Sequence, residues 1–513
     1  MMYTTTDYNS ISLYRLFRNA SGGQLATSVL AILVGHFVIR GIYRLYFHPL
    51  SKFPGPKSAA VSHVPEVLAT WQGEQHKRVA LLHERYGSVV RIAPDEVSFV
   101  HADAWKDIYG HGSKGTLGGM PHKPWHRHTN PNGATSLIIA QDADHTRMRR
   151  LFNPAFSERA LKQQEPLFMK YVNLLAEKLH EGIERDPNHK FDMLKMYNFT
   201  TFDVMGDLTF GEPLQMLSNA TYDPWVTAIF AATKTGTRLG LMVHYPLVEK
   251  AFKALIPPSI MTKKRYEHHK FAEERVTKRL ERGREHKGVD IWDLVLNKSE
   301  EKGLSRPEMD NNAGLFMIAG TETTATLVSG LTAMLLDHPR AMKKLTTEIR
   351  GAIKTPEDMT IERCAALPYL NACIKEALRL YPPVATGRPR VSPPEGSTVC
   401  GHYVPPGWIV SAPHLAMYTS ASNFKDPVSF IPERWLGDAR FESDKRHALQ
   451  PFHVGPRDCL GKNMAYHEMR LIMTRVLHTF DLELCEESGN WRDQHCYVLW
   501  EKKPLMCTVK AVI

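Results

Sequence analysis

One cysteine of this chain lies among neighbours that suit a metal ligand. The window from Phe452 to Asn463 reads FHVGPRDCLGKN and places Cys459 between Gly455 and Gly461. Glycine lets the backbone turn tightly and approach a flat ring closely. The stretch from Leu460 to Phe480 reads as a helix, and the amides at its N-terminus would stabilise a thiolate over a thiol. Because this window offers no second soft ligand, a lone thiolate here favours an iron atom held by a porphyrin.

Two other interpretations of Cys459 are open at this point. The sulfur could belong to a buried structural cysteine, or it could be the nucleophile of a hydrolase with His453 as its base. The glycines on either side, and Arg457 just before the cysteine, disfavour both interpretations.

A segment rich in threonine lies midway along a long predicted helix. It runs from Ala319 to Thr324 and reads AGTETT. Glycine and β-branched threonine are poor helix formers, so we expect the helix to loosen here. On these residues alone, the simplest interpretation is a local irregularity whose hydroxyl groups are hydrogen-bonded.

A third pattern places an acid and a base on one helix face. Glu376 and Arg379 have the i, i+3 spacing that brings two side chains together. The spacing alone is weak evidence, because Glu281 and Arg284 match it in a run that looks solvent-exposed. The first pair, however, has leucine neighbours and a Tyr-Pro-Pro end, and Arg434 follows later in a Pro-Glu-Arg-Trp sequence.

Together these patterns resemble the motifs of the cytochrome P450 family. The window around Cys459 matches the haem-binding signature F-x-x-G-x-R-x-C-x-G at every fixed position. The other segments resemble the A-G-x-[DE]-T, E-x-x-R and P-E-R motifs, in family order, and the resemblance covers roughly residues 50 to 513. It implies a cytochrome P450 fold, haem b (iron protoporphyrin IX) as cofactor with Cys459 as its axial ligand, and a monooxygenase activity.

The resemblance also implies roles for individual residues. Cleavage of dioxygen needs two protons, and a hydroxyl beside an acid in an opened helix can relay them, which makes Thr323 and Glu322 the expected catalytic pair. The residues expected to hold the haem and its propionates are Phe452, Arg457, Gly461, Arg390, Arg149 and His145. Glu376, Arg379 and Arg434 would form a buried network behind the haem.

One of these positions departs from the family pattern. Where the family has tryptophan in a W-x-x-x-R helix, this chain has His145. An imidazole N–H can also donate to a carboxylate, so a propionate contact is still expected. Arg147 or Arg150 could take the place of Arg149 in this helix.

The elements that must position these residues are mostly helical. Residues 165–182 carry an apolar stripe of helical period. The sequence from Ser305 to Glu308 is a capping box with proline at the helix start, and a largely apolar helix can run from it to Asp337, before Pro339. Between Pro382 and Pro413, β-branched and aromatic residues alternate with Pro-Gly turns, which favours short strands. We therefore expect a mainly α fold with a smaller β region.

An apolar segment precedes this body. It runs from Leu25 to Ile39 and reaches Phe47 if Arg40 and Arg44 extend to the interface, which is enough for a single transmembrane helix. A cleaved signal peptide is disfavoured, because no small-residue cleavage site follows. The positive charges after the segment predict a body in the cytosol at the endoplasmic reticulum membrane. The expected divisions are a lumenal segment (1–23), a signal anchor (24–47), a proline-rich elbow (48–57) and the catalytic domain (58–513).

Charge and cysteine usage exclude other classes of protein. The formal net charge is +10, but the basic residues are scattered among acids and no zinc-finger spacing occurs, so nucleic acid is not an expected partner. The seven cysteines are odd in number and all follow residue 363. Such usage is unlike an extracellular disulfide framework and favours a reducing compartment.

The expected reaction inserts one oxygen atom of O2 into a small hydrophobic substrate, with electrons from NADPH-cytochrome P450 reductase. The stretches 145–161 and 461–472 resemble fungal P450s of secondary metabolism, in particular the isotrichodermin (trichothecene) hydroxylase-like group, so the expected substrate is a terpenoid or polyketide. A P450-fold isomerase or dehydratase and a non-catalytic haem-binding protein remain alternatives.

The expected oligomeric state is a monomer. By family analogy, substrate contacts are expected from residues 105–140, 211–260, 315–319, 384–387 and 497–499.

Overall fold

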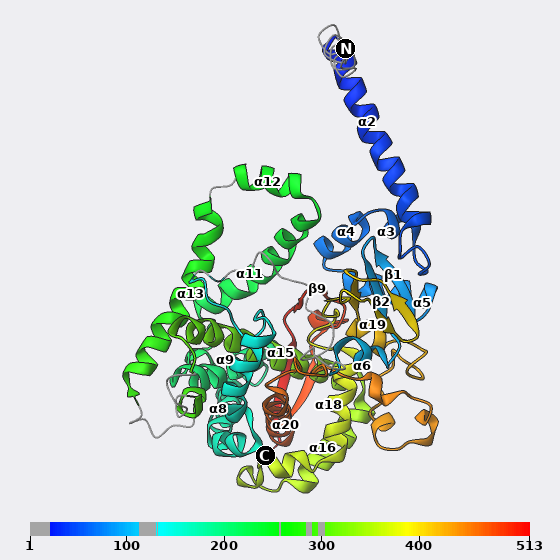
Figure 1. The fold of residues 1–513 in the computed structure, drawn as a ribbon. Coiled ribbons are helices and arrows are strands. Elements are labelled where there is room, and N and C mark those ends of the chain that lie inside the picture. The colour runs from blue at the N-terminus through cyan, green and yellow to red at the C-terminus, as the bar shows by residue number, and fades with distance from the viewer. Residues whose placement is uncertain are drawn as a thin grey trace, which may run out of the picture.

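Helices dominate the structure. The computed structural model describes residues 21–111, 130, 132–255, 258–283, 290–295 and 303–512. In these residues the helices form a broad body with small sheets at its edges, and one long helix projects from it (Figure 1). The mainly α fold with a smaller β region that the sequence predicts is therefore confirmed.

The bounds of the elements are as follows. The longer helices of the body are α4 (Val64–Gln72), α5 (Gln75–Tyr86), α7 (Asp142–Phe152), α8 (Glu158–Arg185), α9 (Met193–Phe210), α11 (Pro224–Gly240), α12 (Pro246–Leu255), α13 (Pro258–Glu281), α15 (Arg306–Asp337), α16 (Pro339–Ala352), α18 (Pro368–Leu380) and α20 (Lys462–Thr479). The shorter ones are α3 (Lys57–Val61), α6 (Ala104–Tyr109), α10 (Met216–Asn219), α14 (Ile291–Val295), α17 (Ile361–Ala365) and α19 (His414–Tyr418), with 3-10 turns that include η3 (Leu241–His244) and η7 (Pro432–Trp435).

The strands form sheets of two to four members. The largest has the order β1 (Val89–Ala93), β2 (Glu96–Phe99), β7 (Ile409–Ser411) and β4 (Arg390–Val391), in which β2 and β7 are parallel and the other neighbours antiparallel. The second joins β3 (Lys190–Asp192), β11 (Met506–Ala511) and β8 (Phe480–Leu484). The two hairpins are β5 (Ser397–Val399) with β6 (His402–Val404), and β9 (His495–Tyr497) with β10 (Leu499–Glu501). The strands expected between 382 and 413 are present.

Helix α15 passes through the middle of the larger hydrophobic core. The expected capping box begins it: the Ser305 hydroxyl accepts from the Glu308 N–H, and the Glu308 carboxylate accepts from the Ser305 N–H at 2.9 Å. Most of its residues are buried, because α9 packs along it and α18 and α20 pack beside it. A smaller core lies between the four-stranded sheet and helices α5, α6 and α19. A helix so enclosed is a rigid wall for whatever lies next to it.

Buried ion pairs tie α18 to the turn η7. Both oxygens of Glu376 accept hydrogen bonds from Arg379, at 2.7 and 2.9 Å, and one also accepts from Arg434 at 3.0 Å. Trp435 donates its indole N–H to the same carboxylate at 2.9 Å, and Arg434 forms a second ion pair with Asp444. These charged side chains are fully buried. The expected network is confirmed. With Asp444 included, two buried carboxylates balance two buried guanidinium groups.

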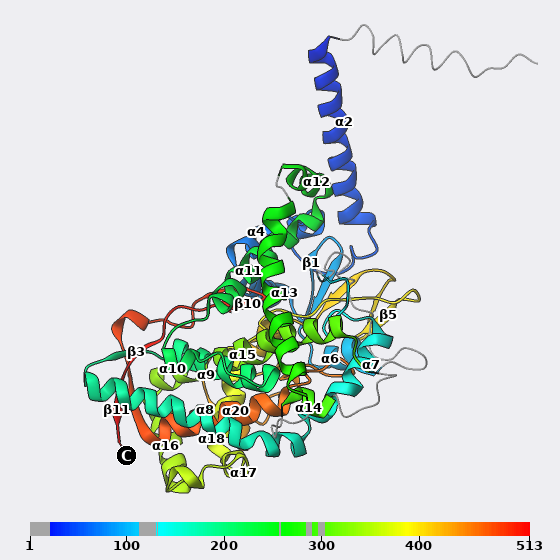
Figure 2. The ribbon, with the colours of Figure 1, turned by 90° about the vertical axis from the view of Figure 1, so that its left-hand side faces the viewer.

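The projecting helix is α2 (Gly22–Ile42), which continues into a π-helical turn from Tyr43 to Phe47. It extends away from the body in both views (Figures 1 and 2), and none of the residues of α2 is buried. The segment from Gly22 to Phe47 is long enough to cross a membrane, and its most apolar 18-residue stretch has a mean hydropathy of 1.9. Most of the expected lumenal segment, residues 1–20, lies outside the described residues.

The base of α2 is fastened to the body. The guanidinium of Arg91, which is 2% exposed, donates to the Arg44 carbonyl at 2.8 Å. Arg44 in turn donates to the Val61 carbonyl. The His48 ring lies 4.4 Å from the ring of Trp408, between centroids. The elbow after the helix is thus bound to the sheet region at several points.

We expect Glu376→Gln to destabilise the fold by about 3–5 kcal/mol, because two buried guanidinium groups would then face one remaining carboxylate. Chemical denaturation followed by circular dichroism measures the change. Glu281→Gln is the matched control: Glu281 is exposed at the end of α13, and its partner in the sequence pattern, Arg284, lies outside the described residues. A change within about 0.5 kcal/mol is expected there. Equal effects in both variants would contradict the structural role of the network.

We expect removal of residues 1–42 to release the protein from membranes at high salt while the body stays folded, because the deleted helix contributes no buried residue. High salt is needed, since a basic body adheres to anionic lipid. Removal of residues 1–47 should lower the free energy of unfolding by a further amount of about 1–3 kcal/mol. The reason is that the buried Arg91 then loses the Arg44 carbonyl as its hydrogen-bond acceptor. Membrane sedimentation and denaturation of both truncated proteins test this. Equal stability of the two would show that the Arg44 contact contributes nothing.

Candidate active site

The loop before α20 holds Cys459 through its own backbone. The Cys459 N–H donates to the Phe452 carbonyl at 2.8 Å, and Gly455 turns the loop at a φ of +80°. A Cβ at Gly455 would lie 2.0 Å from the carbonyl oxygen of Tyr109, so only glycine fits where the loop crosses the end of α6. The sulfur then lies just before α20, where the Gly461 N–H forms a hydrogen bond to it.

Opposing effects act on the Cys459 thiol. Burial raises its pKa, whereas the Gly461 N–H and the positive charge of Arg388 lower it. Although protein surrounds it, Cys459 keeps exposed surface, because that surface opens into an internal cavity. The other six cysteines are buried or half-buried, and all seven are free thiols. A structural cysteine would not face an open space in this way.

The cavity lies between the Cys459 loop and α15, and residues of both line it. Residues of α15 between 315 and 324 form one wall, and residues 451–461 with the start of α20 form the wall that carries the sulfur. The apolar part of the lining is completed by Leu137, Ile138, Phe156, Met205, Leu378, Pro383 and Val384. Such a space suits a flat apolar group held between the sulfur and the helix.

Three arginines bring positive charge to this cavity. Arg149 of α7 donates to the Asp458 carbonyl at 2.6 Å and pairs with its carboxylate, and Arg457 pairs with Asp142 at 2.7 Å. Arg388 also lines the cavity, and burial lowers the pKa of its guanidinium. Across the part of the chain that the structure describes, no carboxylate forms an ion pair with Arg388. The cavity therefore suits a ligand that carries acidic groups.

His145 lines the cavity from the same helix as Arg149. Burial, followed by the charges of Arg457 and Arg149, lowers its pKa to about 4. The imidazole is therefore neutral near pH 7 and keeps one N–H to donate. The two competing arginines of this helix point elsewhere, since Arg147 pairs with Glu308 and Arg150 is exposed.

Arg390 does not line the cavity. Its guanidinium lies over the ring of Tyr109, 5.0 Å from the centroid, and burial lowers its pKa to about 10. Arg388, two residues earlier, lines the cavity instead, and its carbonyl accepts from the Tyr109 hydroxyl at 2.7 Å. The sequence predicts Arg390 alone for this place and does not single out Arg388, because the spacing of an Arg-Pro-Arg run does not tell which arginine faces inward. Phe452 and Gly461 do line the cavity.

The threonine segment of α15 remains a regular α-helix. Thr323 lines the cavity, and its hydroxyl donates to the Ala319 carbonyl at 2.7 Å. Thr321, Thr324 and Thr326 donate in the same way to the carbonyls four residues before them. These hydrogen bonds satisfy each hydroxyl, and the packing of α9, α18 and α20 against α15 accompanies a helix without the expected loosening.

Glu322 points away from the cavity. Adjacent residues on an α-helix point in different directions, so the carboxylate next to Thr323 is directed into the protein, where Lys502 forms an ion pair with it. The Lys502 ammonium also donates to Thr326 at 2.9 Å. Burial raises the pKa of Glu322, and the charge of Lys502 opposes that effect. Thr323 and Glu322 are thus neighbours in sequence that face different surroundings.

A second acid, which the sequence motifs do not single out, does line the cavity. Glu468 of α20 is buried, and burial raises its pKa to about 8, with a smaller opposing effect from a Thr324 hydrogen bond. Its Oε1 has no hydrogen-bond partner among the described residues. The signal in the sequence is slight: Glu468 lies one helical turn after Met464, on a face that is otherwise apolar. Burial therefore favours the protonated form of this carboxyl, which can donate a hydrogen bond.

The residues present fit a haem group. The cavity has one exposed sulfur at a helix N-terminus, an opposite helical wall with a hydroxyl, and an arginine, Arg388, without an acidic partner in the described structure. A porphyrin ligand offers an iron for the sulfur and propionates for the cations. A hydrolase built on Cys459 and His453 does not fit, because burial lowers the His453 pKa to about 2 and its ring packs against Tyr109.

Comparison with known proteins agrees with this site. The family model described as Cytochrome P450 matches residues 54–509. Cytochrome P450 monooxygenase FUM2 of Gibberella moniliformis is 48% identical over 91% of this chain and 98% of its own length. Cytochrome P450 monooxygenase efuB of Hormonema carpetanum is 45% identical over 91% of this chain and 93% of its own length, and lcsI of Purpureocillium lilacinum is 42% identical over 96% and 94%. Because the match extends over nearly the whole length of these fungal enzymes, the chain belongs to the cytochrome P450 family of monooxygenases.

Proposed function

We propose that this P450 uses haem b to insert one oxygen atom of O2 into a small hydrophobic fungal metabolite, a terpenoid or polyketide. Its electrons would come from NADPH through a separate NADPH-cytochrome P450 reductase. The observation that carries the proposal is the exposed sulfur of Cys459, which faces the threonine wall of α15 across a mostly apolar cavity with three arginines in its lining. When bound there, haem supplies dioxygen binding and the oxidising chemistry.

In this proposal each wall of the cavity has a separate task. Cys459 would hold the haem iron through its sulfur; burial raises the pKa of the thiol, and the Gly461 N–H before α20 opposes that effect. Arg388, Arg149 and Arg457 hold the propionates, with the neutral His145 as a further donor. Arg390 supports this set from behind Tyr109.

Thr323 is the proposed proton-holding group on the substrate side. Its hydroxyl can keep its bond to the Ala319 carbonyl and still accept from a water in the cavity, because a hydroxyl has two lone pairs. Glu322 would reach the cavity only after leaving Lys502. Its proposed role is therefore to supply protons through a rearrangement of this ion pair.

The proposed substrate lies against apolar residues. From the regions expected to contact it, the cavity lining includes Leu137 and Ile138, residues of 315–319 and Val384. The described residues of 211–260 and 497–499 do not line the cavity, and residues 112–129 lie outside the described structure. An apolar lining favours a substrate with few polar groups.

The proposed setting is the endoplasmic reticulum membrane, with residues 24–47 as the anchor, residues 48–57 as the elbow and the 58–513 domain in the cytosol as a monomer. The support is the apolar projecting helix and the positive charges at its body end, Arg40, Arg44, Lys52 and Lys57.

We expect Cys459→Ser to abolish the red-shifted Soret band of the reduced carbonyl complex, because a hydroxyl oxygen cannot replace a thiolate as axial donor. Difference spectroscopy of the purified full-length protein measures this. Cys400→Ser is the control, since Cys400 is half-buried and distant from the cavity lining. A normal carbonyl spectrum in Cys459→Ser would contradict the ligand assignment.

We expect Thr323→Ala to lower the amount of product formed per NADPH consumed, while haem and substrate still bind. The decrease should not exceed about 10²–10⁴-fold, which is the usual contribution of a positioned proton donor. Reduced oxygen should escape as hydrogen peroxide. The matched variant is Thr323→Ser, which keeps the hydroxyl and should retain coupling.

Product, peroxide and NADPH consumption are measured in the same assay. Unchanged yields in Thr323→Ala would make Thr323 a helix residue only. Turnover that continues without dioxygen would show that the protein is an isomerase or dehydratase and not a monooxygenase. The absence of turnover with every tested substrate class would favour a haem-binding protein without catalytic activity.

A further inference from the structure

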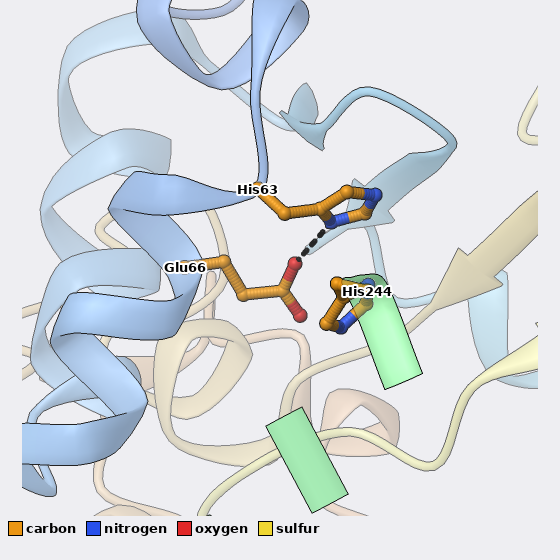
Figure 3. Close-up of side chains that lie close together, drawn as sticks. All are labelled: His63, Glu66 and His244. Carbon is orange, nitrogen blue, oxygen red and sulfur yellow. Dashed lines mark hydrogen bonds and ion pairs between the residues drawn. The ribbon is translucent and has the colours of Figure 1, made fainter. Parts of the chain in front are cut away.

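Two histidines and a glutamate from distant parts of the chain meet at a place that is not part of the cavity lining. His63 and Glu66 lie at the start of α4, and His244 ends the turn η3 that follows α11 (Figure 3). One ligand atom from each side chain lies within 4.8 Å of the other two. The rings of His63 and His244 stack with centroids 4.0 Å apart. All three residues are half-buried, so they are held in place and still reachable from solvent.

His63 faces carboxylates on both sides of its ring. Its Nδ1 lies 2.9 Å from Glu66 Oε2, and its Nε2 lies 3.4 Å from Asp95 Oδ1. A neutral imidazole carries a single N–H and can satisfy one of these oxygens. Asp95 Oδ1 is buried and has no hydrogen-bond partner in the part of the chain that the structure describes. A neutral His63 therefore cannot donate to Glu66 and to Asp95 at the same time.

A metal ion on the Nδ1 side of His63 removes this mismatch. Histidines that bind metals almost always donate their other ring N–H to a carboxylate or carbonyl, which fixes the ring. Here Asp95 is placed to accept from Nε2 of His63, while Nδ1 is directed to the side of Glu66. The carboxylate–histidine arrangement of a metal site is thus present before any ion is added.

We propose that His63, Glu66 and His244 bind a divalent transition-metal ion of the zinc class. Imidazole nitrogens with a carboxylate oxygen suit zinc, whereas calcium and magnesium prefer oxygen ligands throughout. Ligand atoms around a tetrahedral zinc lie roughly 3.3 Å apart, so the group closes from its present separation by small side-chain rotations. Water takes the fourth position.

The ion would fasten two parts of the fold that are distant in sequence. The only chain segments it touches are the start of α4 and the turn after α11. Arg238 of α11 already joins them, because its guanidinium donates to the Trp71 carbonyl at 3.0 and 3.1 Å and lies 4.8 Å from the centroid of that ring. Metal binding adds a second point of attachment, and it restrains the chain between α11 and α12.

The test uses the full-length haem protein, treated with EDTA and then titrated with zinc chloride. Zinc retained after gel filtration gives the stoichiometry, and competition with a chromogenic chelator gives the affinity. We expect one zinc per chain in the wild type and no tight zinc binding in His63→Ala/His244→Ala. In His244→Ala the affinity should be at least tenfold weaker, because loss of even a supporting partner of a metal ligand weakens binding by about 10–100-fold. The matched control is His189→Ala/His402→Ala, which changes two exposed histidines outside the cluster and should bind as the wild type.

Two further measurements keep the result decisive. Glu66→Gln preserves an acceptor for His63 but removes the charged ligand, so it should weaken binding in a protein whose carbonyl spectrum shows an intact fold. Limited proteolysis between residues 238 and 250 should slow several-fold with zinc in the wild type and not in His244→Ala. Equal zinc binding by the wild type and the double histidine variant overturns the proposal, and so does the absence of tight zinc in the wild type, which would leave a hydrogen-bonded His63–Glu66 pair.

Discussion

One sulfur atom has to face an enclosed space without being covered by protein, and much of the structure serves that requirement. The backbone does the positioning: Gly455 passes the carbonyl of Tyr109 where no side chain fits, and the N–H of Cys459 closes the loop on Phe452. The chain that leads into this loop comes from η7, which is fixed to α18 by the buried Glu376 network. A loop held from both ends presents its sulfur to α15 in one position, and that fixes the width of the cavity.

Helix α15 adds a second constraint, which concerns protons. Because the helix stays regular through the threonine segment, the hydroxyl of Thr323 and the carboxylate of Glu322 cannot face the same side. The cavity instead has the carboxyl of Glu468, supplied by α20, the helix that follows the Cys459 loop. Lys502, near the end of the chain, therefore determines whether Glu322 is available at all. The distribution of acids around the cavity depends on residues that no single motif contains.

The sequence predicts features that neighbouring residues determine, but it does not predict the direction in which a given side chain points. Cys459 and the capping box of α15 could be identified because each belongs to a short pattern of residues close together in sequence. Which of Arg388 and Arg390 lines the cavity could not be predicted from the sequence. Both follow the same motif, and the turn into β4 decides which one faces inward. The ion pair of Glu322 and the approach of His244 to His63 were out of reach for a different reason: they join segments more than a hundred residues apart, through packing that has no period in sequence.

The attachment of α2 to the body has a consequence for how the protein moves. A helix tied by a flexible tether would let the body tumble freely beside the bilayer, but Arg91 holds the carbonyl of Arg44 and His48 packs on Trp408, so the helix is a strut. With α2 as the proposed membrane anchor, rotation of the body is coupled to rotation of the helix in the lipid, which is slow because lipid is viscous. The body keeps a preferred tilt and height, and diffusion at the membrane reduces to motion in a plane. Encounters with any other anchored protein become a search in two dimensions with the two partners already aligned.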